Sequence, residues 1–202
     1  MNEEVQARLD RLESLEEIRQ LVSKYALAID CRDLDALVHL FVDDVQVGRD
    51  RHGRSALKEW YDDLLRHRFG QTAHLVANHI IEFDGIDRAH GVVYCRAEHE
   101  MGERFVIVLL QYYDDYERHD GRWLFRRHRP LYWYACDVTE RPVGGRRLRW
   151  PDGDPADGDL PEWWPSWREF WEQASPTPGP LREPSRPGEF LTGLRRRQGR
   201  AL

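Results

Sequence analysis

Apolar residues recur every three or four positions from residue 5 to residue 29, with charged residues between them. The apolar stripe comprises Val5, Leu9, Leu12, Leu15, Ile18, Leu21, Val22, Tyr25 and Ile29. This spacing predicts a long amphipathic helix that ends near residues 31–33. Asp33 is placed to cap a shorter helix over residues 34–41. A third helix is expected to begin at an N-cap on Ser55 and to end at Gly70.

The pattern changes after residue 70 from a helical period to an alternation of apolar and polar residues. This alternation predicts four strands, over residues 73–83, 88–98, 104–116 and 122–134. The dipeptides Asp84-Gly85 and Asp120-Gly121 supply turns for hairpins. A run of helices followed by strands with short turns predicts an α+β fold, in which a curled antiparallel sheet carries its helices on one face.

Proline and glycine become frequent after residue 140, and they interrupt regular structure. We therefore expect one domain over residues 1–139, followed by a Pro-, Gly- and Trp-rich extension over residues 140–202 that is not an independent domain. Aromatic residues at helical spacing predict a short helix over residues 162–173 that docks on this domain or on a neighbouring subunit. The chain ends in a basic run that we expect to be poorly ordered or to wrap a partner chain, and this run comprises Arg195, Arg196, Arg197 and Arg200.

The charge and composition exclude several classes of protein. The chain has 30 Lys and Arg against 36 Asp and Glu, a formal net charge of -6, which argues against a nucleic-acid-binding protein. The first residues are too charged for a signal peptide, and no apolar run is long enough to cross a bilayer. We therefore expect a cytoplasmic protein with no membrane partner. The 8 Trp and 8 Tyr, against 2 Met, predict cavities walled by rings, which suit aromatic or polycyclic ligands.

No metal or organic cofactor is expected from the motifs in the chain. The three cysteines, Cys31, Cys95 and Cys136, are too scattered for a disulfide framework or a zinc knuckle. No pair among the nine histidines has the local spacing of a zinc site, and His99 is expected to be an exposed strand-end residue. The chain also contains neither a Gly-rich phosphate loop nor a nucleophile elbow.

Three segments occur in an order that is similar to one known family. They are the end of the long helix over residues 25–30, the strand His74-Leu-Val-Ala-Asn78, and the turn Tyr116-Glu-Arg-His-Asp120-Gly121-Arg-Trp123. Together they resemble the SnoaL-like branch of the nuclear-transport-factor-like family, which includes scytalone dehydratase, bile-acid 7α-dehydratase and hexachlorocyclohexane dehydrochlorinase. The resemblance covers residues 8–134. It implies a cone-shaped α+β barrel, in which the curled sheet wraps around the long helix and two shorter helices.

The resemblance also implies a catalytic group. In the eliminating members of the family, an aspartate at the end of the first helix pairs with a histidine on the first long strand, and these positions correspond to Asp30 and His74. Tyr25 falls where the bile-acid dehydratase also has tyrosine, at a position that contacts the substrate or leaving group. Independently of the family, an imidazole with a pKa of about 6.5 can accept a proton at neutral pH, and a carboxylate on its other nitrogen stabilises the imidazolium.

Plainer roles stay open for each of these residues. Asp30 could end the first helix or cap the next one, Tyr25 could pack in the core, and His74 could be a structural histidine.

Seven further residues are expected to bind the substrate. Alternation places His74 and Asn78 on one strand face, so Asn78 is expected in the pocket and His79 outside it. One of the two arginines among the mostly solvated charges of residues 126–129 is expected to turn inward and bind an oxygen or a halide-like leaving group. The full expected set is Asn78, Trp60, Tyr61, Arg127, Arg129, Tyr132 and Tyr134.

The leading prediction is a cofactor-independent lyase, a dehydratase or a related eliminating enzyme, that acts on a hydrophobic aromatic or polycyclic small molecule. His74 would remove the proton, Asp30 would support the imidazolium, and Tyr25 would assist the leaving group. The same groups are compatible with retro-aldol C–C cleavage and with a ketosteroid-isomerase-like isomerisation. Two rival hypotheses are a non-catalytic small-molecule binding module and a structural assembly subunit. The resemblance also implies a homo-oligomer, with a trimer favoured over a dimer.

Overall fold

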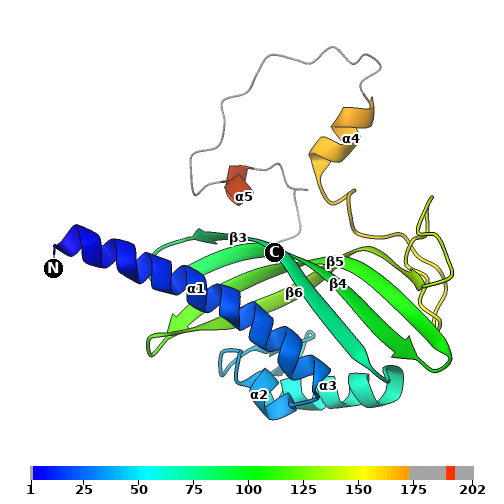
Figure 1. Ribbon diagram of the computed structural model, residues 1–202, viewed down its shortest axis with the longest axis horizontal. Coiled ribbons are helices and arrows are strands. Elements are labelled where there is room, and N and C mark those ends of the chain that lie inside the picture. Colours follow the sequence, from blue (N-terminus) through cyan, green and yellow to red (C-terminus); the bar gives the residue numbers. More distant parts are fainter. Residues whose placement is uncertain (1, 173–189, 194–202) are drawn as a thin grey trace.

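Three helices and a four-stranded antiparallel sheet form the body of the molecule, as the computed structural model in Figure 1 shows. The structure describes residues 2–172 and 190–193. The N-terminal elements are α1 (Glu3–Asp30), α2 (Leu34–Val38), β1 (Gln46–Val47), β2 (Arg51–His52) and α3 (Arg54–Arg68). The main sheet has the order β3-β4-β5-β6, with the strands β3 (Thr72–Phe83), β4 (Arg88–Met101), β5 (Arg104–His119) and β6 (Arg122–Asp137). This arrangement confirms the predicted α+β class.

The connection from α1 to α2 follows from two adjacent residues. Arg32 adopts a positive φ of 62°, which reverses the chain after α1. Asp33 then caps α2, because its side chain accepts a hydrogen bond of 2.9 Å from the backbone N–H of Ala36, as predicted. Helix α2 is shorter than predicted, because the residues after it bond to β6: Phe125 N–H donates to Leu40 O at 2.8 Å, and Val42 N–H donates to Phe125 O at 3.0 Å.

The start of α3 differs from the sequence prediction. Gly53, with a φ of 94°, occupies the N-cap position, and no side chain caps the helix there. The prediction of Ser55 as the N-cap is therefore wrong. Gly53 suits this turn because a residue without Cβ adopts a positive φ at little steric cost.

A tight turn between β5 and β6 and several irregularities in strand pairing decide which side chains of the sheet point inward. The turn between β5 and β6 is the predicted one, with positive φ at both Asp120 (48°) and Gly121 (76°), as a two-residue hairpin turn requires. Irregularities then interrupt the pairing, between Val76 and His79 in β3 and at two places between β5 and β6. Each irregularity changes which residues of a strand face the helices.

The main sheet is apolar on both faces. The inner face packs against α1, α2 and α3 in one core that includes Ile18, Leu37, Val93 and Phe125. The outer face carries a smaller core, made by Val92, Tyr113 and Leu131 of the sheet with Leu160, Trp163 and Leu191 from beyond residue 140. Leu160, Trp163 and Leu191 therefore pack on the side of the sheet opposite the helices, the side on which Figure 1 shows α4 and α5.

The predicted aromatic helix is present as α4 (Pro165–Glu172), and a short helix α5 (Phe190–Gly193) follows it. Trp163, just before α4, is only 3% exposed on the outer face of the sheet, whereas Phe170 and Trp171 on α4 are 68% and 66% exposed. The basic run at residues 195–200 lies outside the described residues. Within the described ranges, no helix has the length and apolar character needed to span a membrane.

Candidate active site

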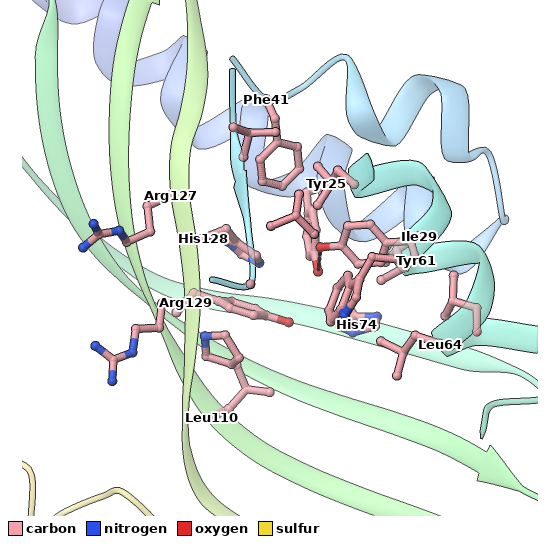
Figure 2. Close-up of a pocket in the computed structure, with 18 of the residues that line it drawn as sticks. Tyr25, Ile29, Phe41, Tyr61, Leu64, His74, Leu110, Arg127, His128 and Arg129 are labelled. Atoms are coloured by element: carbon pink, nitrogen blue, oxygen red, sulfur yellow. Dashed lines mark hydrogen bonds between the residues drawn. The ribbon is translucent and has the colours of Figure 1, made fainter. Parts of the chain in front are cut away.

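A cavity of about 910 Å³ lies between the inner face of the sheet and helices α1 and α3. Its walls include the tyrosine rings of Tyr25, Tyr61, Tyr112 and Tyr132, together with aliphatic side chains. The imidazoles of His74, His99 and His128 also border it. Figure 2 shows His74 and His128 on different strands, with Tyr25 between them. The pocket thus combines aromatic walls with several groups that can exchange protons.

Asp30, the last residue of α1, is joined to His74 on β3 by two hydrogen bonds. The Nδ1 of His74 donates to Asp30 Oδ1 at 2.7 Å, and the backbone N–H of His74 donates to Asp30 Oδ2 at 2.8 Å. Thr72 adds a third bond, from its hydroxyl to Asp30 Oδ1 at 2.8 Å. Burial tends to raise the pKa of Asp30, but these hydrogen bonds outweigh it, so the pKa is lowered and the carboxylate is ionised.

This contact fixes the chemistry of the imidazole. The side chain of His74 is 6% exposed, and its Nδ1 is occupied by Asp30. The ring nitrogen that remains for a molecule in the pocket is Nε2. With the proton held on Nδ1, Nε2 carries a lone pair and can accept a proton, while Asp30 stabilises the charge that results.

Arg32 holds the end of α1 against the start of β3. Its guanidinium donates to Ile29 O and to the Thr72 hydroxyl, each at 2.7 Å, and also to Gly70 O. Because Thr72 itself donates to Asp30, this clamp sets the position of the Asp30 carboxylate relative to His74. Sequence reasoning did not identify Arg32.

Tyr25 faces the pocket one and a half helical turns before Asp30. Its ring centroid lies 6.4 Å from that of His74, and its hydroxyl lies 3.3 Å from the Tyr61 hydroxyl. Burial raises the pKa of Tyr25 well above its usual value and raises the pKa of Tyr61 to about 12. Both phenols therefore keep their protons and can donate hydrogen bonds. Tyr25 and Asp30 do not meet each other; each instead approaches His74.

Among the predicted substrate-binding residues, Trp60, Tyr61 and Tyr132 border the cavity. Asn78 does not, and the predicted face is wrong for it. The pairing of β3 with β4 is irregular between Val76 and His79, and this irregularity reverses the alternation of side chains. Asn78 is therefore exposed. His79 turns inward instead, and its Nε2 lies 3.1 Å from the Tyr116 hydroxyl.

Tyr134 is also outside the cavity lining, contrary to the prediction. The pairing of β5 with β6 shifts between Leu109–Tyr134 and Leu110–Tyr132. Tyr132 and Tyr134, two residues apart, consequently face opposite sides of the sheet.

The side chains of Arg127 and Arg129 point away from the pocket in Figure 2, although both residues border the cavity. The Nε of Arg127 lies 3.7 Å from Oδ2 of Asp115. The Cζ of the Arg129 guanidinium lies over the ring of Trp163, 5.3 Å from the ring centroid. The prediction that one of these arginines turns inward is therefore wrong. The residue between them, His128, is the one that points into the pocket.

Residues 10–129 match the SnoaL-like domain family. The chain belongs to this family. The match spans more than half of the chain and confirms the resemblance drawn from the three sequence segments. It also agrees with the observed order of three helices followed by a curled antiparallel sheet.

Relatives of this SnoaL-like protein include eliminating enzymes. Gamma-hexachlorocyclohexane dehydrochlorinase from Sphingobium indicum is 27% identical over 144 residues, which cover 68% of this chain and 88% of the relative. A crystal structure of a candidate scytalone dehydratase from Novosphingobium aromaticivorans has 25% identity and a TM-score of 0.58, and the likeness covers 65% of this chain and 92% of that one. A hexachlorocyclohexane dehydrochlorinase from Novosphingobium barchaimii shares the fold, at 22% identity and a TM-score of 0.60, over 68% of this chain and 98% of that one.

His99 is a pocket residue that sequence reasoning placed at an exposed strand end. Strand β4 continues to Met101, beyond its predicted end, and the register places His99 opposite Thr72 and Val106. His99 is 7% exposed, and its ring centroid lies 5.6 Å from that of His74. Burial, aided by the nearby His74, lowers the pKa of His99 to about 3. In the SnoaL-like pocket this ring is therefore neutral at neutral pH.

The buried histidines make the stability of the protein sensitive to acid. Burial lowers the pKa of His99 to about 3 and that of His79 to about 4, whereas the unfolded chain binds these protons near pH 6.5. The free energy of unfolding is therefore expected to fall as the pH drops from about 6.5 towards 4, by up to about 1.4 kcal/mol per pH unit for each histidine. Urea unfolding at pH 7, 6, 5 and 4.5 measures this slope.

His99→Phe is the matched variant for this measurement, because it keeps an aromatic ring and removes the titrating group. We expect it to flatten the slope below pH 6.5. Equal slopes in the variant and the unaltered chain would show that His99 does not contribute.

A carboxylate lies behind the imidazole of His128, as it does behind that of His74. His128 Nδ1 lies 2.8 Å from Asp114 Oδ1, and the two side chains are 4% and 0% exposed. Sequence reasoning missed both residues. Within residues 2–172 and 190–193, no three side chains of His, Cys, Asp or Glu come together as a metal site.

Proposed function

We propose that this SnoaL-like protein is a cofactor-independent lyase that eliminates a leaving group from a hydrophobic, ring-containing small molecule. The observation that carries the proposal is the 2.7 Å hydrogen bond between His74 Nδ1 and Asp30 Oδ1 at the wall of an aromatic pocket. The names of the curated relatives, which are dehydrochlorinases, support an elimination as the reaction class.

His74 is the base in this proposal. Its Nε2 takes a proton from a carbon next to an electron-withdrawing group, and the pair of electrons left behind forms the new double bond as the leaving group departs. Asp30 stabilises the imidazolium, and the protonated phenol of Tyr25 donates a hydrogen bond to the departing group. The low exposure of His74 strengthens these interactions, because little water is present to screen them.

The shape and lining of the pocket support a substrate with one or more rings. A cavity of about 910 Å³ lies at the upper end of the range for small-molecule sites. Tyr61, Tyr132 and Trp60 offer flat apolar surfaces, with Tyr61 5% and Trp60 42% exposed. Trp60 is therefore the residue best placed to contact a substrate at the entrance.

The site itself favours an enzyme over a simple binding module. A simple binding module would not need a carboxylate hydrogen-bonded to a buried imidazole, and Asp30 supplies one. For an assembly subunit the tryptophans point in both directions, because Trp163 packs on the sheet of its own chain whereas Trp171 on α4 is 66% exposed.

Asp30→Asn tests the proposal without removing the base. The amide keeps the size of the side chain but cannot stabilise the imidazolium, so we expect kcat to fall by about 10²-fold. The measurement is the absorbance of the conjugated product formed from bicyclic ketones that carry a leaving group at the β-carbon.

Asp35→Asn is the control, because Asp35 is an exposed carboxylate that pairs with Lys58 on the surface. It should leave kcat unchanged. Equal rates for Asp30→Asn and the unaltered chain would overturn the proposed role of the Asp30–His74 pair.

A further inference from the structure

We propose that His128 and Asp114 form a second proton-transfer pair in the same pocket and that this pair protonates a hydroxyl leaving group. The inference rests on the proposed function and deepens it. A halide departs as a stable anion, whereas a hydroxyl group needs a proton to leave as water. The second pair therefore points to alcohols, and to dehydration, as the substrate class and reaction.

One ring nitrogen of His128 is left without a hydrogen-bond partner in the described part of the chain. Its ring projects from β6 into the pocket beside Tyr25 (Figure 2). Nδ1 is occupied by Asp114 at 2.8 Å, and Nε2 is buried without a hydrogen-bond partner among residues 2–172 and 190–193. A buried polar atom of this kind calls for an explanation, because most such atoms are hydrogen-bonded. An oxygen of a bound substrate would supply the missing partner.

Asp114 is held rigidly behind the imidazole. Its Oδ1 faces His128, and its Oδ2 accepts a hydrogen bond of 3.0 Å from the Tyr116 hydroxyl. That hydroxyl also lies 3.1 Å from His79 Nε2, so the network reaches across the inner face to β3. Burial lowers the pKa of His79 to about 4, which makes this ring a neutral partner near pH 7.

A buried carboxylate needs a positive partner, and His128 is the group placed to provide it. The Asp114 side chain has no exposed surface, and within the described part of the chain no Lys or Arg forms an ion pair with it. An uncompensated charge in such a place is costly. In this proposal His128 acts as the general acid, with Asp114 as the counter-ion of its imidazolium.

The aromatic rings around His128 act in the same direction. Tyr112 stacks on its ring with a centroid distance of 4.0 Å and an interplanar angle of 26°, and Tyr25 and Phe125 lie at 4.2 Å and 5.0 Å. The faces of aromatic rings carry negative potential and attract cations. The stacked ring of Tyr112 and the buried carboxylate of Asp114 would thus both stabilise an imidazolium at this position.

The two pairs can divide an elimination between them. His74 Nε2 takes the proton from carbon, the C–H electrons form the double bond, and the C–O bond breaks with its electrons on oxygen. The Nε2–H of His128 gives its proton to that oxygen, and water leaves. His74 ends charged and His128 neutral, so exchange with solvent restores both. The ring of Tyr25 lies near both imidazoles, with centroid distances of 6.4 Å and 4.2 Å, which places the two pairs around one reaction space.

Two bicyclic ketones that differ only in the leaving group test the assignment. The probes are 1-decalones with a hydroxyl or a chloride at C3, and loss of either group gives the same conjugated enone. We expect His128→Gln to reduce turnover of the hydroxy ketone by about 10²-fold and turnover of the chloro ketone by less than about threefold. His67→Gln is the matched control, because His67 is 76% exposed on α3.

The outcomes separate this inference from the proposed function. Equal losses on both ketones, or no loss on either, would overturn the role of His128 as an acid. If His74→Gln left both reactions unchanged, the proposed function would fail instead.

A binding measurement decides the question if neither ketone reacts. We expect added 2-naphthol, a ring compound with one hydroxyl, to shift the Nε2 resonance of His128 in ¹⁵N NMR spectra. Binding of 2-naphthol without that shift would overturn the inference, as would an absence of binding.

Discussion

Replacing His74 by glutamine is expected to reduce kcat for the proposed elimination by about 10³-fold, because glutamine cannot accept the proton. The amide can still donate a hydrogen bond to Asp30, so the carboxylate keeps a partner. The loss should therefore lie in kcat more than in KM, since the walls of the pocket stay in place. Conversion of β-substituted bicyclic ketones to conjugated products, followed by absorbance, measures both constants.

His67→Gln is the control for this variant as well, since it makes the same substitution at an exposed position. Circular dichroism spectra and urea unfolding curves should show that both variants fold. A kcat for His74→Gln within threefold of that of the unaltered chain would assign the base to another group. A large rise in KM at constant kcat would indicate that His74 binds the substrate without taking its proton.

Much of the fold could be predicted because it depends on local patterns. The period of the apolar stripe from Ile18 to Ile29 defined the buried face of α1, and the change to alternation after residue 70 marked the start of the sheet. Asp33 and the Asp120-Gly121 turn were recognised because each acts within a few residues of itself. The contact between Asp30 and His74 came from the family resemblance, because no local pattern links residues 44 positions apart.

The remaining site residues were missed or misplaced because strand irregularities change the facing of side chains. Simple alternation from His74 puts Asn78 in the pocket, but the shift after Val76 exposes it. The two-residue turn at Asp120-Gly121 alone would place Asp114 opposite Arg127. A further shift between the Asp115–Arg127 and Tyr116–Phe125 pairs brings Asp114 opposite His128 instead. Neither the composition nor the hydrophobic period of the chain predicts such shifts in strand pairing. The pair formed by His128 and Asp114 is therefore found only in the structure.

Several expectations stay predictions. The predicted trimer rests on the family resemblance, and the cytoplasmic location rests on the charge and apolar pattern of the sequence. The substrate class rests on the aromatic composition and on the proposals above. The division into a domain over residues 1–139 and an extension over residues 140–202 is likewise a proposal. The outer core bears on this division, because Leu160 and Trp163 of the extension are buried against the sheet of the preceding domain.

Trp163→Ala is expected to lower the free energy of unfolding by about 3 to 4 kcal/mol, the usual cost of removing a buried tryptophan. Trp163 is 3% exposed, packs beside Leu160 and Tyr113, and lies under the guanidinium of Arg129. Its loss would leave a cavity between the extension and the outer face of the sheet.

Trp171→Ala provides the control for the Trp163 variant, because Trp171 is 66% exposed on α4 and its removal should change the free energy of unfolding by less than about 0.5 kcal/mol. Urea unfolding measures both variants, with an unchanged slope in denaturant as the sign that only stability has changed. Equal and small losses for the two tryptophans would mean that the extension does not dock on the outer face in solution. A large loss at Trp163 alone would make the extension part of the folded domain, because its tryptophan would then share the cooperative unfolding of the sheet that carries His128 and Arg129.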